Sequence, residues 1–104
     1  MRIRFHAAAR SEFLAATAWY EHERPGLAEN FVAQVDRALE TIRAQPEAWP
    51  VVGDEADVPL RRFVLGRFPY NVVFAVLRAE LLVIAVAHGR RSPGYWRGRL
   101  TPDR

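Results

Sequence analysis

The chain of 104 residues contains no cysteine and no lysine. The lack of cysteine excludes a disulfide framework, a thiolate nucleophile and Cys-ligated zinc, so the sequence indicates neither secretion nor redox chemistry. Its apolar runs, such as residues 81–87, are far shorter than the roughly 20 residues that a membrane-spanning helix needs. No apolar signal-peptide region follows Arg2 and Arg4. We therefore expect a cytoplasmic protein that does not contact membranes.

Motifs of common cofactor and catalytic sites are also missing. The sequence has no glycine-rich phosphate loop, and its histidines and acidic residues do not have the spacing of metal ligands. Neither Ser11 nor Ser92 lies in a nucleophile elbow of the G-x-S-x-G form. We expect the protein to use neither a cofactor nor a metal.

The length and composition fit one compact domain over residues 1–104. Half of the residues are hydrophobic (50%) and 26% are charged, as in ordinary globular proteins. A domain of this size has room for one core but not for the deep active site of a large enzyme.

Charge is distributed unevenly along the chain, whose net charge is +3. Residues 1–59 carry six arginines and ten acidic residues, a net charge of −4. Residues 60–100, which we call the basic block, carry eight arginines and one acidic residue, Glu80, a net charge of +7. This asymmetry indicates an anionic partner, either a nucleic acid or an acidic polypeptide.

Hydrophobic periodicity predicts two helices and four strands in the order βααβββ. Alternating or continuous apolar residues indicate strands over residues 2–6, 60–68, 70–77 and 81–88. Helical spacing indicates helices over residues 9–24 and 27–44, which Pro25 and Gly26 separate. Residues 45–59 contain three prolines and a glycine, so we expect a loop that Trp49 anchors on the core. The pattern predicts an α+β fold with an antiparallel helical hairpin.

The last two predicted strands are apolar on both faces, so both faces of the sheet need other parts of the protein packed against them. One pair of amphipathic helices can cover only one face of a sheet. We therefore expect the second face to be open and to bind a partner, because exposed apolar patches mark interfaces.

Residues 88–99, directly after the last predicted strand, are the most informative stretch. They combine His88 and an aromatic pair with four arginines: Arg90, Arg91, Arg97 and Arg99. Guanidinium groups can bind phosphate oxygens, and aromatic rings can stack on bases or on arginine. Arg61, Arg62 and Arg67 on the preceding strand are candidates to extend this basic face.

A second interpretation of the same stretch is purely structural. Tyr95 and Trp96 then pack the end of the chain onto the sheet, while the arginines pair with acidic residues of the first half or remain solvated. His88 is better explained as a strand-end residue bonded to the backbone, because no nearby carboxylate is placed to orient it. The second predicted helix has a net charge of −1, so we expect no sequence-specific DNA binding by this chain alone.

With these features the chain resembles the RelE/ParE superfamily of toxins from bacterial type II toxin–antitoxin pairs. The resemblance rests on the βααβββ order, on the stretch RRFVLGRFPY (residues 61–70), and on IAVAHGRR (residues 84–91) followed by Pro93 and the Tyr95-Trp96 pair. It implies a small curved, mainly antiparallel sheet with a helical hairpin on one face and the antitoxin on the other. It also implies an antitoxin whose acidic and apolar C-terminal segment folds on the toxin.

Mechanism divides the members of this superfamily. RelE-like members cut mRNA on the ribosome with basic residues on the second and third strands, a later arginine and a tyrosine near the C-terminus. In this chain Arg62 and Arg91 match two of the basic positions, and Tyr95 or Trp96 lies near the tyrosine position.

Two expected basic residues are absent, however. Val64 and Asn71 occupy their positions. Valine cannot transfer a proton, and asparagine lacks both the charge and the bidentate fork of arginine. ParE-like members also lack this set, and those characterised act on DNA gyrase without nuclease chemistry.

Three hypotheses remain. The first is a growth-inhibiting ParE-like toxin that binds gyrase, is neutralised by its antitoxin and is not an enzyme; its target-binding residues are then Arg62, Arg67, Arg90, Arg91, Tyr95, Trp96 and Arg97. The second is a ribosome-dependent mRNA interferase whose catalytic residues are Arg62, His88, Arg91 and Tyr95. The third is a non-toxic module that only binds the antitoxin.

Overall fold

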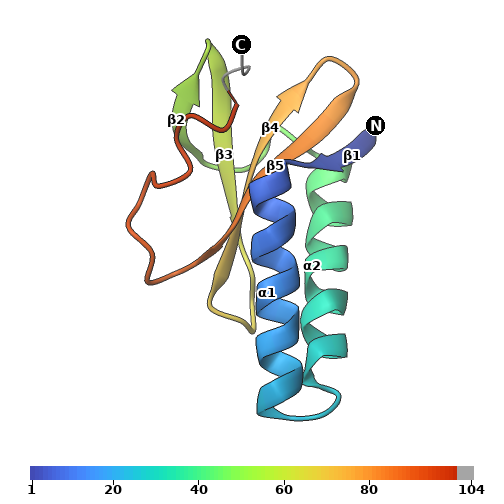
Figure 1. Ribbon diagram of the computed structural model, residues 1–104. Coiled ribbons are helices and arrows are strands. Elements are labelled where there is room, and N and C mark those ends of the chain that lie inside the picture. The colour runs from blue at the N-terminus through green and yellow to red at the C-terminus, as the bar shows by residue number, and fades with distance from the viewer. Residues whose placement is uncertain (101–104) are drawn as a thin grey trace.

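A computed structural model describes residues 1–100 as two helices packed on one side of a five-stranded sheet (Figure 1). In chain order the elements are β1 (Arg2–Phe5), α1 (Ala7–Glu23), α2 (Leu27–Ala44), β2 (Val51–Glu55), β3 (Val58–Val64), β4 (Tyr70–Leu77) and β5 (Glu80–His88). The strand order is β1-β5-β4-β3-β2, and only the β1–β5 pair is parallel. The predicted α+β fold with a helical hairpin on one face is confirmed. Residues 101–104, the end of the expected domain, lie outside the described residues.

Local sequence signals explain where the helices begin and end. The Nδ1 atom of His6 accepts a hydrogen bond from the backbone N–H of Ala8 at 3.0 Å and so caps the first turn of α1. Pro25 follows the last turn, and Gly26 turns the chain into α2 with φ +90°, a conformation that glycine adopts without steric cost. The buried residues of α2 recur every three or four positions: Ala28, Phe31, Val35, Ala38, Leu39 and Ile42.

The structure has one strand more than the sequence predicts. Residues 51–55, expected in a loop, form β2 and pair with β3 as a hairpin. The loop prediction was wrong here because Gly53 and Pro59 read as breakers, whereas both are accommodated in the outermost pair of strands. The turn residues Ala56 and Asp57 have φ of 52° and 63° but include no glycine, so the usual hairpin signal is missing.

The second face of the sheet is largely covered rather than open, contrary to expectation, and its end near Val64, a residue that is 60% exposed, faces solvent. Most of this face is packed beneath residues 89–100, which we call the C-terminal segment and which follow β5 along the side of the sheet away from the helices (Figure 1). Trp96 is only 8% exposed and contacts a cluster formed by Leu60, Val73, Ala75, Leu82, Ile84, Ala85 and Ala87. The chain therefore supplies most of its own second cover, and the sheet offers no wholly bare face for the antitoxin that the resemblance implies.

Candidate target-binding site

The C-terminal segment starts at a junction between β5 and the turn that joins β3 to β4. Gly89 donates its backbone N–H to the carbonyl of Pro69 at 2.7 Å, so the segment begins beside the turn that carries exposed Arg67. His88 accepts a hydrogen bond on Nδ1 from the backbone N–H of Arg90 at 3.0 Å. This contact agrees with the interpretation of His88 as a strand-end residue bonded to the backbone.

Two of the predicted side chains stack within the segment. The guanidinium carbon of Arg91 lies 3.8 Å from the centre of the Tyr95 ring, a cation–π contact. The Tyr95 ring in turn meets the Trp96 ring edge-on, with ring centres 5.4 Å apart. Because Trp96 is buried, it anchors the segment, and the exposed surface is formed by its neighbours.

Arg97 folds back over Gly94. The Arg97 guanidinium occupies the space beside Gly94, where a Cβ atom would lie 2.5 Å from Nη1, and the φ of +81° is the backbone conformation that favours glycine. Of the eight arginines in the basic block, six are exposed: Arg62, Arg67, Arg78, Arg90, Arg91 and Arg97. Arg61 is held by the carbonyls of Glu47 and Trp49, at 3.1 and 2.9 Å.

The positions at which the resemblance expects ribonuclease residues lie together on the sheet. Arg62, Val64 and Asn71 share the face on which Trp96 packs, because Val64 pairs with Asn71 and Arg62 pairs with buried Val73 of that face, but they lie at the end that the C-terminal segment leaves exposed. Val64 is 60% exposed. The geometry therefore brings the three positions together, but only Arg62 offers a cationic side chain there.

The central polar contact of the site involves a residue that sequence reasoning missed, Glu12 of α1. Its Oε1 accepts hydrogen bonds from the backbone N–H of Val86 (3.0 Å) and from Arg99 Nη1 (3.1 Å). Its Oε2 accepts from the Tyr95 hydroxyl and from Arg99 Nη2, both at 2.9 Å. The side chains of Glu12 and Arg99 are each 17% exposed, so this ion pair is better shielded from water than a surface pair.

These surroundings also determine the protonation state of Tyr95. Burial, reinforced by the hydrogen bond to Glu12, raises the pKa of Tyr95 to about 12. The hydroxyl is therefore protonated at neutral pH and serves as a donor to the carboxylate.

A sequence signal for Glu12 does exist, although it is faint. Glu12 lies three residues after Ala9 and four before Ala16, both of which are buried, so it shares their face of α1. An acidic residue between small residues on the apolar face of a helix implies a buried partner. That Arg99, 87 residues away, is the partner could not be read from the sequence.

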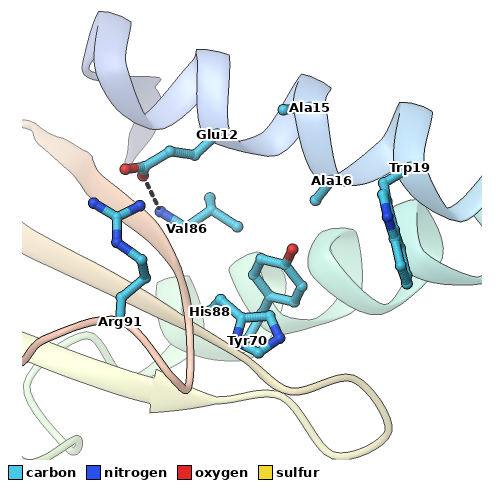
Figure 2. A pocket seen from close by; sticks show the side chains of 8 residues that line it. All are labelled: Glu12, Ala15, Ala16, Trp19, Tyr70, Val86, His88 and Arg91. Carbon is cyan, nitrogen blue, oxygen red and sulfur yellow. Dashed lines mark hydrogen bonds between the residues drawn. The ribbon is translucent and has the colours of Figure 1, made fainter.

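A groove opens between α1 and the end of β5. Its volume is about 400 Å³, and Figure 2 shows Tyr70 and His88 beneath the helix, Trp19 at one end, and Glu12 and Arg91 at the other. Trp19 is 56% exposed. The Tyr70 side chain is partly buried, and this burial raises the pKa of its hydroxyl. The groove thus combines an aromatic floor with the positive charge of Arg91, which suits an apolar segment carrying an acidic residue.

The described residues offer groups for binding anionic partners. Residues 1–100 contain no group of three His, Cys, Asp or Glu side chains arranged to hold a metal ion. In the same range, neither helix combines the length and the apolar character needed to cross a membrane. The exposed guanidinium groups can bind carboxylates or phosphates of a partner.

Comparisons with known proteins agree with this fold. Residues 3–93 match the family model of the ParE toxin of the type II toxin–antitoxin system, parDE. A solved structure of the chromosomal ParDE toxin–antitoxin system from P. aeruginosa has a similar fold, with a TM-score of 0.70 and 17% sequence identity over 85% of this chain and 95% of that chain. A search of curated protein sequences finds no match. Since the family model spans most of the sequence, the chain belongs to the ParE toxin family of type II toxin–antitoxin systems.

Proposed function

We propose that this toxin inhibits growth by binding DNA gyrase, that it does so without nuclease chemistry, and that a cognate antitoxin neutralises it. Membership of the ParE family supports the gyrase target and the antitoxin, and the composition of one patch of the sheet carries the lack of nuclease chemistry. Arg62, Val64 and Asn71 lie together there, and two of the three cannot supply the charge or the proton transfer of an RNA-cleaving site.

The state of Tyr95 supports the same conclusion. Its hydroxyl is already donated to Glu12, and its ring is covered by Arg91. A general acid must present its proton to the leaving group, and a tyrosine whose pKa is raised to about 12 and whose proton is engaged by a carboxylate is a poor candidate. We therefore assign Tyr95 and Arg91 to binding.

The target-binding surface in this proposal is formed by exposed arginines of the basic block. Arg90, Arg91 and Arg97 lie on the C-terminal segment, Arg67 lies in the adjoining turn, and Arg62 lies on the exposed end of the second face of the sheet. Guanidinium groups of this kind bind acidic protein surfaces and raise association rates at low ionic strength. Trp96 contributes indirectly, because its buried ring holds the segment in place.

The antitoxin, in turn, is proposed to bind the groove between α1 and β5. An acidic and apolar segment finds exposed Trp19 and the cation of Arg91 there. Most of the second face of the sheet is covered by the chain itself, which is why the groove is preferred to that face.

Expression in a bacterial host without antitoxin tests the proposed function. Growth and a DNA-damage reporter are recorded in the same culture, and soluble protein is verified. We expect growth arrest with the reporter switched on. Arrest with a silent reporter and cleaved transcripts that disappear in Arg91→Ala would instead establish the mRNA interferase, and normal growth would leave only the antitoxin-binding module.

A further inference from the structure

The position of the C-terminal segment depends on side chains. In the described structure, the segment forms neither a helix nor a strand. From Arg90 to Leu100, its backbone hydrogen bonds within the described chain join residues three positions apart, such as Tyr95 to Ser92 and Arg99 to Trp96. Such local turns shape the segment but do not attach it to the sheet.

The attachment occurs at an edge of β5 that has no neighbouring strand. Strand β1 ends at Phe5, which pairs with Val83, so β5 continues beyond the end of its neighbour. Unpaired backbone groups at such an edge need other partners. Glu12 accepts the N–H of Val86, and Arg99 Nη1 donates to the carbonyl of Ile84 at 3.0 Å.

Glu12 and Arg99 therefore join three parts of the molecule at one point. The carboxylate of Glu12 receives donors from β5, from Tyr95 and twice from Arg99. Each partner is more than 70 residues away in sequence, so the contact fixes α1, β5 and the C-terminal segment relative to one another. A carboxylate in contact with an arginine at two oxygens has a defined orientation.

The contact extends to the exposed arginines through Tyr95. Glu12 holds the Tyr95 hydroxyl, and the Tyr95 ring carries the Arg91 guanidinium. Arg97 is bent over Gly94 in the turn that leads into Tyr95. The family match ends at residue 93, so Tyr95 and Arg99 lie outside the range that the family model describes.

We propose that Glu12 is the positioning residue of the target-binding surface: through Tyr95 and Arg99 it clamps the C-terminal segment and thereby sets where Arg91 and Arg97 are presented. The part of this inference that concerns the target rests on the proposed function. The clamp itself concerns only contacts within the chain and can be measured without any target.

Hydrogen exchange of the purified full chain tests the clamp. Glu12→Gln is nearly isosteric, but its amide NH2 replaces one of the two oxygens and so faces an Arg99 N–H together with either the Val86 N–H or the Tyr95 hydroxyl. The charge that pairs with Arg99 is also lost, so the clamp is weakened. We expect amides of residues 90–100 to exchange at least tenfold faster than in the wild type, while those of α2 change less than twofold. Glu23→Gln is the matched control, since Glu23 is an exposed glutamate of the same helix. Equal exchange in the two variants would overturn the clamp.

A milder variant guards against global unfolding. Tyr95→Phe removes one hydrogen bond to Glu12 and leaves the Arg99 ion pair intact. If Glu12→Gln also accelerates exchange throughout α2, the variant has unfolded globally, and Tyr95→Phe then becomes the test of the clamp. In that variant we expect faster exchange confined to residues 90–100, and unchanged exchange there would contradict the clamp.

Growth arrest by the same variants, at matched soluble expression, tests the link to the target. We expect Glu12→Gln to need at least tenfold more protein than Glu23→Gln for the same arrest. If Glu12→Gln accelerates exchange in residues 90–100 but arrests growth as strongly as Glu23→Gln, the positioning role is overturned. A wild type that does not arrest growth would contradict the proposed function instead, while the exchange rates would still decide whether Glu12 holds the segment.

Discussion

At the residue scale, Tyr95 shows how surroundings decide what a functional group can do. The sequence offered it as a target contact, as a catalytic hydroxyl or as a packing residue. In the structure its ring supports Arg91, while its hydroxyl donates to Glu12 at 2.9 Å. Burial comes first among the causes that raise its pKa to about 12, and the Glu12 hydrogen bond comes second. The residue therefore links an internal carboxylate to an exposed cation.

A pH titration tests this environment. The pKa of Tyr95 in the folded state exceeds the ordinary value of 10.0, so its protonated hydroxyl stabilises the fold fully below pH 10, and this contribution is lost as the pH rises toward 12. Burial raises the pKa of Tyr20 and Tyr70 as well. We expect phenolate absorbance at pH 11 to be much lower in the folded protein than in urea. Equal absorbance in both would contradict the described environment.

The sequence predicted those residues of the candidate site that lie near one another along the chain. His88, Arg91 and Tyr95 could be proposed because they lie within eight residues of one another after an apolar strand. Glu12 was missed because hydrogen-bond partners 74 to 87 residues away leave no local pattern. The sequence also left two roles open for Trp96, contact with a target or packing on the sheet, and its burial shows that it packs on the sheet.

At the element scale, the sheet is covered by different structures on its two faces. The helices cover one face, and a segment without regular structure covers the other through Trp96. The register of β4 and β5 shifts after Val73, which pairs with Ala85 while Phe74 pairs with Val83. The extra residue, Ile84, turns with Ala85 toward the C-terminal segment and enlarges the apolar surface that Trp96 meets.

Replacing Trp96 tests whether the second cover stabilises the fold. Trp96→Ala removes a ring that is only 8% exposed, so we expect the free energy of unfolding to fall by about 3–5 kcal/mol in urea denaturation. Trp19 is 56% exposed, and Trp19→Ala should cost less than about 1 kcal/mol. Similar losses in the two variants would show that the C-terminal segment is not part of the core.

In the β2–β3 turn, by contrast, we predict substitutions that raise the free energy of unfolding. Ala56 and Asp57 both have positive φ, a conformation that costs roughly 1–2 kcal/mol for residues other than glycine and is less costly for asparagine. Ala56→Asn combined with Asp57→Gly should therefore raise the free energy of unfolding by about 1 kcal/mol. Asp54→Gly, in the neighbouring strand, should lower it instead. A double variant less stable than the wild type would contradict the turn geometry.

The elements that the sequence predicted well are those with strong periodicity. Helix α2 matches its predicted range, residues 27–44, because its apolar stripe is regular and Pro25 and Gly26 fix its start. Strand β2 has only five residues, with a glycine at its centre and a proline in its partner strand, so its pairing depends on tertiary context. The cover of the second face was unpredictable for a similar reason, since the C-terminal segment has no periodic pattern of its own.

At the scale of the whole molecule, the acidic and basic parts of the chain meet at only a few points. In the described residues, ion pairs between the two parts are Arg4 with Glu80 (2.8 Å) and Glu12 with Arg99 (2.9 Å). The hydrogen bond from Arg4 lowers the pKa of Glu80 below its ordinary value. The exposed arginines of the basic block form no ion pair with described acidic residues and are available to a partner. A partner that they contact should bind more weakly as salt rises.

The most direct measurement is supercoiling by purified DNA gyrase in the presence of the toxin. We expect the wild type to inhibit supercoiling, and the double variant Arg90→Ala with Arg97→Ala to require at least tenfold more protein for the same effect. Arg24→Ala with Arg37→Ala removes the same charge from two exposed positions, one directly after α1 and one on α2, and should inhibit like the wild type. Full supercoiling with a stoichiometric excess of correctly folded wild type, or equal inhibition by both double variants, would contradict gyrase binding through the C-terminal arginines.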